Sequence, residues 1–146
     1  NMPVILYTRS PTETDHEYWY AHFTGSEWED HKLCNSGKWF PQTPEGHKEW
    51  EVHYFGGMTL HPADADIVYL SRQVHGVFEI ERRETGDKGY SWTTEAVTVN
   101  SEYDNVRPFI PRGLGAGSPE IVLWMENQKY IHYTNFKTSI KYVIRP

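Results

Sequence analysis

The residues of this sequence best suited to metal chemistry are one cysteine and three histidines. His31 and Cys34 stand three positions apart, and His47 and His53 follow them along the chain. One thiolate and three imidazoles are suitable ligands for a tetrahedral zinc ion. A proline-containing loop separates the second pair from the first, so a buried free thiol at Cys34 is the competing interpretation. Zinc is therefore a candidate cofactor, with these four side chains as its ligands.

The elements that must position these residues are short β-strands. Apolar and β-branched residues form short runs, several of which alternate with polar residues, and turn-forming residues bound each run. No stretch of comparable length repeats its apolar residues at helical spacing. The sequence predicts an all-β fold with strands over 4–9, 17–23, 52–60, 67–72, 77–83, 121–126 and 139–144.

A repeat divides the predicted strands into three groups. Three similar runs have starts 63 and 54 residues apart, namely 3–9, 66–72 and 120–126. An aromatic-rich strand is predicted after each, over 18–23, 77–82 and 130–133. This spacing is near the ~40–50 residues of a β-propeller blade, and closed propellers use about four to eight blades. We expect a single segment of antiparallel four-stranded blades, about three in number and forming an incomplete ring, over 1–45, 46–100 and 101–146.

Residues 85–92 carry the most specific motif. Their sequence, Thr-Gly-Asp-Lys-Gly-Tyr-Ser-Trp, matches the Asp-box pattern Ser/Thr-x-Asp-x-Gly-x-Ser/Thr-Trp at each defined position. The pattern predicts a turn in which Asp87 accepts backbone hydrogen bonds, Gly89 takes a positive φ and Trp92 packs between strands. A degenerate copy without the aspartate lies at 23–28. We interpret Asp87 as a residue that builds the turn rather than as a catalytic carboxylate.

Together these features resemble the Asp-box, or BNR, repeat family of sialidase-like β-propellers. Within it the chain looks most like the BNR-containing polysaccharide lyases, which include ulvan lyases and related enzymes acting on rhamnose–glucuronate linkages. The similar segments are 68–72, 78–81, the Asp box, 105–112 and the region from Leu123 to Tyr133. The similarity spans about 3–143 and matches the C-terminal part of such a propeller. Because family members form a complete ring, we expect further N-terminal blades.

The resemblance implies β-elimination on a uronic acid. In that chemistry a cation neutralises the substrate carboxylate while a base of near-neutral pKa removes the adjacent proton. Arg72 and Arg107 are the candidate cations, and a salt bridge is the alternative role for each. The candidate acid–base residues are His53, Tyr54 and His75, and the candidate substrate-binding residues are Arg112, Tyr130 and Tyr133. A hydrogen-bonded structural role is the alternative for each histidine.

The placement of His53 and Tyr54 rests on the residues that follow them. They precede Phe55, Gly56 and Gly57, a sequence typical of an innermost strand whose glycines allow close packing around the propeller axis. A histidine and a tyrosine on such a strand would face the central cleft.

Composition limits the partners. The chain has 14 Lys and Arg against 20 Asp and Glu, a net charge of −6 with histidine neutral, and no basic run longer than two residues. Nucleic acid and membranes are therefore excluded as expected partners, and no apolar run approaches the ~20 residues of a membrane span. The expected partner is an acidic polysaccharide or oligosaccharide bound in a locally basic cleft. This substrate implies a secreted or periplasmic protein, although no signal peptide is visible.

Three functions remain open. The first is a polysaccharide lyase. The second is a sialidase-like glycoside hydrolase with a tyrosine nucleophile and a cluster of Arg72, Arg107 and Arg112 on the sialate carboxylate, but that family's N-terminal arginine motif is not in this sequence. The third is a non-catalytic carbohydrate-binding or assembly module that completes a ring with itself or a partner chain, since an incomplete ring exposes strand edges.

Overall fold

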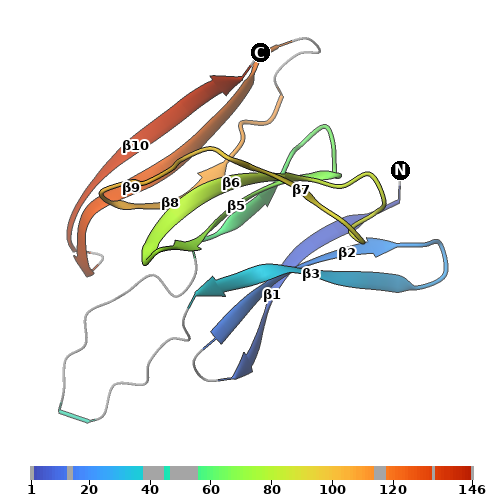
Figure 1. Cartoon of the computed structure of the whole chain (residues 1–146), viewed down its shortest axis with the longest axis horizontal. Helices are drawn as coiled ribbons and strands as arrows, with labels where there is room; N and C mark the ends of the chain where they lie inside the picture. The colour runs from blue at the N-terminus through green and yellow to red at the C-terminus, as the bar shows by residue number, and fades with distance from the viewer. Residues whose placement is uncertain are drawn as a thin grey trace.

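The computed structural model describes residues 2–12, 15–37, 45–46, 56–113, 118–132 and 134–145. Every helix or strand element in these ranges is a β-strand, which confirms the predicted all-β class. The strands form three antiparallel sheets that are stacked in chain order (Figure 1). Within each sheet every strand pairs with its neighbour in sequence, so each sheet is a meander.

The sheets differ in their number of strands. The first contains β1 (Val4–Thr12), β2 (Asp15–Phe23) and β3 (Trp28–Gly37). The second contains β4 (Met58–Leu60), β5 (Ile67–Val74), β6 (Val77–Glu84) and β7 (Thr93–Ala96). The third contains β8 (Asp104–Phe109), β9 (Glu120–His132) and β10 (Asn135–Arg145). Among the described residues, the predicted four-stranded sheet is therefore found once, between two three-stranded sheets.

The second sheet is buried on both faces, which explains the apolar start of β5. Val68 and Leu70 pack against Tyr18 of the first sheet. Tyr69 points to the opposite face and packs in a second cluster with Trp124 of the third sheet. Because successive side chains of a strand alternate between faces, a strand covered on both sides is apolar at every position.

β4, the first strand of the second sheet, contacts β1 and β8, the first strands of the other two sheets. Two glycines just before β4 connect β8 to the second sheet and extend the pairing within the second sheet. The Arg107 N–H of β8 donates to the Gly56 carbonyl at 2.5 Å, and the Ser71 N–H of β5 donates to the Gly57 carbonyl at 2.9 Å. A Cβ at Gly56 would collide with Ser71, so this approach requires glycine.

The Asp-box turn between β6 and β7 has the predicted hydrogen bonds. Asp87 accepts one from the Ser91 N–H at 2.8 Å and one from the Ser91 hydroxyl at 2.6 Å. The Thr85 hydroxyl donates to the same carboxylate at 2.8 Å. These bonds, with that of the Ser91 hydroxyl the strongest, lower the pKa of Asp87 to about 2. The carboxylate is thus ionised at neutral pH and engaged by its own turn.

Through Gly89 and Trp92 this turn packs against the first sheet. Gly89 has a φ of 104°, as predicted, and a Cβ there would lie 2.9 Å from Tyr20 and 3.0 Å from His31. The Trp92 indole donates to the Gly89 carbonyl at 3.0 Å, and its ring centroid lies 5.1 Å from that of Tyr20. The Asp box therefore fastens the second sheet to the first.

The degenerate copy forms the β2–β3 turn, and in it Thr24 accepts backbone hydrogen bonds as Thr85 does in the Asp box. Thr24 Oγ1 accepts hydrogen bonds from the N–H groups of Ser26 at 3.4 Å and Glu27 at 3.2 Å. If the two turns correspond, β1 corresponds to β5, in agreement with the sequence repeat. The first sheet then lacks, among the described residues, a counterpart of β4.

Three strands were not predicted. β3 is rich in polar residues, β7 has four residues that are all exposed, and β8 contains Pro108, which cannot donate to a ladder and argues against a strand. The separate strand predicted over 130–133 is wrong, because Tyr130 lies inside β9, which continues to His132. The strand after it is β10.

Candidate functional site

Residues of all three sheets meet around Tyr18. Its hydroxyl accepts a hydrogen bond from the Gly57 N–H at 2.6 Å and donates to the Ser71 carbonyl at 3.0 Å. The Ser71 hydroxyl donates to the Asn105 carbonyl of β8 at 2.6 Å. Burial raises the pKa of Tyr18 far above its usual value, so its phenol stays neutral. We call Tyr18, Gly56, Gly57, Ser71 and Asn105 the three-sheet junction.

Arg107 lies beside this junction on an irregular part of β8. The pairing of β8 with β9 shifts register between Val106 and Phe109, and Arg107 has a φ of 57°. Such a left-handed conformation is uncommon outside glycine and occurs often at functional sites. The Arg107 side chain is exposed and makes no ion pair with a carboxylate in the described ranges. Among the described residues it is therefore an exposed cation without a carboxylate partner.

Arg72, the other predicted cation, has a protein partner. Its Nε donates to Glu81 Oε1 at 2.8 Å, and its Nη2 lies 2.6 Å from the same oxygen. Glu81 Oε2 accepts from Arg83 at 2.9 Å, and Arg83 also donates to the Leu33 carbonyl of the first sheet at 2.6 Å. Arg72 thus forms a salt bridge, which the sequence analysis gave as its alternative role. This salt bridge belongs to a network that joins the second sheet to the first.

The remaining predicted site residues lie at different places of the fold. His75 is exposed at the tip of the β5–β6 hairpin, with a φ of 53°. Arg112 lines a cavity of about 490 Å³ between the β4–β5 loop and the end of β8. Tyr130 stacks on Phe136 across β9 and β10, with ring centroids 6.4 Å apart. Four further predicted residues fall outside the described ranges: His47, His53, Tyr54 and Tyr133.

His31 and Cys34 both lie on β3 but contact different groups. Cys34 pairs with Tyr18 and packs against the core cluster around it, and burial raises the pKa of its thiol to about 11. The His31 ring lies 6.1 Å from that of His22, nearly parallel to it, and 4.2 Å from that of Tyr90. Cys34 is thus a partly buried free thiol, while His31 has histidine and tyrosine neighbours.

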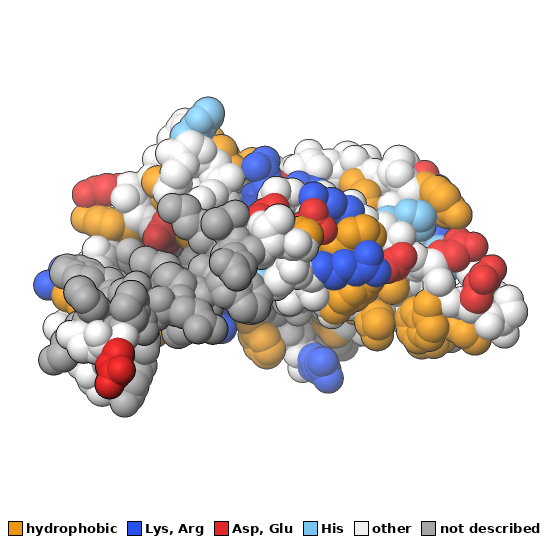
Figure 2. All heavy atoms as spheres, turned by 90° about the horizontal axis from the view of Figure 1, so that it is seen from below, with side chains coloured by type: hydrophobic (Ala, Val, Ile, Leu, Met, Phe, Trp, Pro, Cys, Tyr) orange, Lys and Arg blue, Asp and Glu red, His pale blue; other side chains and the backbone are white. Residues whose placement is uncertain are grey.

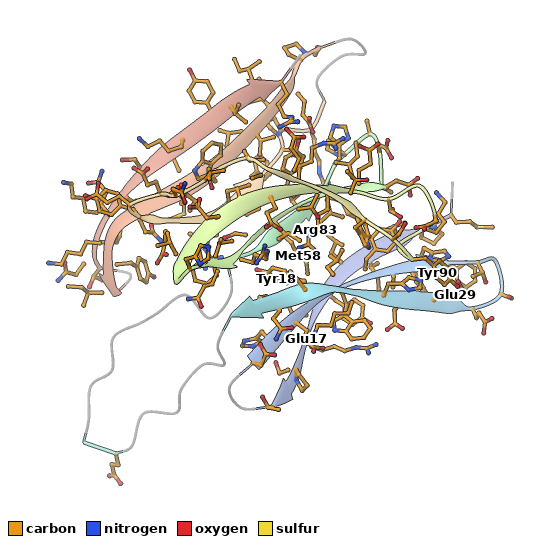
Figure 3. All side chains as sticks on the ribbon, viewed as in Figure 1. Glu17, Tyr18, Glu29, Met58, Arg83 and Tyr90 are labelled. Atoms are coloured by element: carbon orange, nitrogen blue, oxygen red, sulfur yellow. The ribbon has the colours of Figure 1, made fainter. Side chains whose placement is uncertain are left out.

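His22 and Glu29, which the sequence patterns did not single out, form a cluster with His31. One ring nitrogen of each histidine and one Glu29 oxygen lie within 4.8 Å of one another. The Tyr90 hydroxyl donates to Glu29 at 3.1 Å, and the two side chains meet near the β2–β3 turn (Figure 3). We call His22, Glu29 and His31 the hairpin cluster. A sequence signal exists only once β2 and β3 are known to pair, because His22 and Glu29 are then cross-strand partners.

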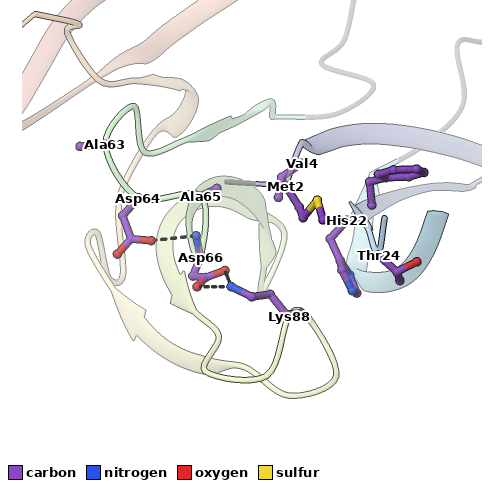
Figure 4. A pocket seen from close by; sticks show the side chains of 10 residues that line it. Met2, Val4, His22, Thr24, Ala63, Asp64, Ala65, Asp66 and Lys88 are labelled. Carbon is purple, nitrogen blue, oxygen red and sulfur yellow. Dashed lines mark hydrogen bonds and ion pairs between the residues drawn. The ribbon is translucent and has the colours of Figure 1, made fainter. Parts of the chain in front are cut away.

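A cavity of about 620 Å³ lies beside the hairpin cluster (Figure 4). His22 of β2 and Thr24 of the β2–β3 turn line it, together with Asp64, Asp66 and Lys88 from loops of the second sheet. Lys88 is 2.8 Å from Asp66 and therefore already paired. With two carboxylates against one paired ammonium group, this cavity does not favour an acidic glycan.

The described residues include no helix that is long and apolar enough to cross a membrane. Comparison of the chain with known protein families, with curated proteins and with solved structures found no match. The resemblance to Asp-box lyases therefore rests on the motifs of the sequence.

Proposed function

We propose that this chain is a segment of a β-propeller with Asp-box turns, and that its protein cleaves uronic-acid-containing polysaccharides by β-elimination. Each of the three meanders would be one blade, over 1–45, 46–100 and 101–146. The stacking of the sheets in chain order and the adjacency of β1, β4 and β8 support this interpretation. The Asp-box turn, which fastens one sheet to the next, supports it as well.

The observation that carries the proposed activity is the exposed guanidinium of Arg107 beside the three-sheet junction, which forms no ion pair with any carboxylate of the described residues. β-Elimination needs a cation on the substrate carboxylate, and a guanidinium binds carboxylates through two parallel hydrogen bonds. The backbone N–H of Arg107 is held by Gly56, and Tyr54 and His53 stand two and three positions before Gly56 in the sequence. The proposed acid–base pair and cation would therefore belong to neighbouring segments. An acidic polysaccharide substrate would place the protein outside the cytoplasm, secreted or periplasmic.

The experiment is a lyase assay on ulvan and related glucuronate polysaccharides that compares the wild-type chain with the Arg107→Ala variant. Elimination creates an unsaturated uronate that absorbs in the ultraviolet, so turnover appears directly as absorbance. Because loss of a group that stabilises transition-state charge typically costs about 10²–10³ in kcat, we expect Arg107→Ala to lose a similar factor.

Lys88→Ala is the matched control. Lys88 is a cation of the Asp-box turn that already forms an ion pair with Asp66. It should keep wild-type turnover. Intact turnover in Arg107→Ala would remove Arg107 from the mechanism. Release of free sialic acid without new absorbance would favour a sialidase instead.

A second candidate function is a non-catalytic module that completes a ring with other copies. The outer face of the third sheet is apolar: Phe109, Ile140, Tyr142 and Ile144 are each more than half exposed. The outer face of the first sheet, seen in Figure 2, carries hydrophobic side chains beside charged ones, among them Ile5 and Trp28. Large exposed apolar patches mark interaction sites, and two different faces would give a head-to-tail contact.

The solution mass tests this second function. Light scattering at micromolar concentration should give a multiple of 17.1 kDa for the wild-type chain. Tyr142→Lys, which puts a charge on the outer face of the third sheet at its strand β10, should return the mass to 17.1 kDa. A monomeric wild-type chain would rule out self-assembly.

A further inference from the structure

We infer that the hairpin cluster of His22, Glu29 and His31 binds a divalent transition-metal ion of the zinc class. Two imidazoles and one carboxylate form a known three-ligand zinc set, in which water takes the fourth position. Magnesium and calcium prefer oxygen ligands, so two histidines select against them. The proposal does not depend on the proposed lyase function.

The β2–β3 hairpin holds all three ligands close together. His22 pairs directly with Glu29, and His31 follows two residues later on the same face of the sheet. His22 Nε2 lies 3.5 Å from Glu29 Oε2, and all three ligand atoms lie within 4.8 Å. Two ligands of a tetrahedral ion with bonds of about 2.0–2.1 Å lie roughly 3.4 Å apart. Small side-chain rotations would therefore complete the coordination geometry.

Both histidines have nitrogen atoms that the surrounding protein does not use. His22 Nδ1 and His31 Nε2 are buried and have no hydrogen-bond partner within the described residues. His22 itself is only 8% exposed. Buried polar atoms in native structures nearly always have a partner, and an exception calls for an explanation such as an ion. Among the described residues His31 Nε2 thus has unused coordination capacity, while His22 approaches Glu29 through its other ring nitrogen, Nε2.

The Asp-box loop orients the cluster from the second sheet. The Tyr90 hydroxyl donates to Glu29 Oε2 at 3.1 Å (Figure 3), and the Tyr90 ring centroid lies 4.2 Å from that of His31. Such outer hydrogen bonds position metal ligands and sustain affinity. The Glu29 side chain is 37% exposed, which leaves an ion a path from solvent. A bound ion would hold the β2–β3 hairpin and the Asp-box loop together.

The test is zinc binding by the full chain after chelation and dialysis. Isothermal titration with Zn²⁺ should show one equivalent bound. Glu29→Gln, a substitution of equal size at a partly exposed position, should weaken the affinity at least about tenfold. His22→Gln should do the same. The Co²⁺ form should show the visible bands of a tetrahedral ion without a thiolate-to-cobalt band.

Two control variants locate the site. Glu27→Gln removes an exposed carboxylate of the same turn, and Cys34→Ala removes the thiol of the alternative set with His31, His47 and His53. Both should bind zinc as the wild type does. Absence of a saturable site, unchanged affinity in Glu29→Gln, or a thiolate band that disappears in Cys34→Ala would overturn the assignment. Circular dichroism on each variant checks the fold, and Glu29→Gln remains the decisive variant if His22→Gln fails to fold.

Discussion

Replacing Glu81 with glutamine should lower the free energy of unfolding by about 3–5 kcal/mol, the usual result when one partner of a buried ion pair is removed. The Glu81 carboxylate lies between Arg72 and Arg83 and is 7% exposed. Arg83 is 9% exposed, and among the described residues its other hydrogen bond is to the neutral Leu33 carbonyl. Glutamine therefore leaves a buried guanidinium without a counter-charge. Urea denaturation followed by tryptophan fluorescence measures the loss.

The same network makes part of the stability depend on pH. Burial alone would raise the pKa of Glu81, but hydrogen bonds from Arg72 and Arg83 outweigh it, and the pKa is lowered from 4.5. A carboxyl group with a lowered folded-state pKa contributes stability above its unfolded pKa and loses it as the pH falls through the folded value. The difference between wild type and Glu81→Gln should therefore be full at pH 7 and shrink below about pH 4.5.

Glu84→Gln is the control for this prediction. Glu84 lies on the same strand and pairs with Arg82 at 2.7 Å, but its side chain is 51% exposed. Exposed pairs contribute about 0–1 kcal/mol, so this variant should stay within that range. Equal losses in the two variants, or a Glu81→Gln difference that does not change with pH, would contradict the assigned role of the network.

Patterns within short stretches of sequence correctly predicted most of the strands and the Asp-box turn. The runs that became β1, β2, β5, β6, β9 and β10 are apolar or alternating and bounded by turn residues. The Asp box was recognised because its residues bond mainly to one another, as the bonds between Asp87 and Ser91 show. β8 was missed because it contains Pro108, and β7 because it buries no side chain.

The candidate sites depend on contacts between distant segments, so the sequence alone predicted them poorly. Arg107 was named, but its left-handed conformation reflects a bulge in β8 and a hydrogen bond to a glycine 51 positions earlier. His31 was named with Cys34, yet the register of β2 and β3 brings it to His22 and Glu29. Neither the register nor the position of the Asp-box loop above His31 can be inferred from one strand.

Gly56→Ala should destabilise the protein by about 3 kcal/mol, the upper end of the usual cost of over-packing. A Cβ at this position would overlap the Ser71 side chain and lie 2.8 Å from the Ser71 carbonyl oxygen. Ser71 cannot easily move away, because it is fully buried and its hydroxyl donates to Asn105 at 2.6 Å. Thermal and urea unfolding measure the loss.

Two further variants test the cause of that loss. Gly86→Ala adds the same methyl group where no atom lies within 4 Å and should change stability by less than about 1 kcal/mol. Ser71→Gly combined with Gly56→Ala removes the overlapping side chain, so the double variant should lose less than the two single variants together. Equal losses of stability in Gly56→Ala and Gly86→Ala would show that the junction is loosely packed.

Because the Gly56 carbonyl also accepts the Arg107 N–H, Gly56→Ala should reduce stability and lyase turnover together. Arg107→Ala, at an exposed side chain, should reduce turnover alone.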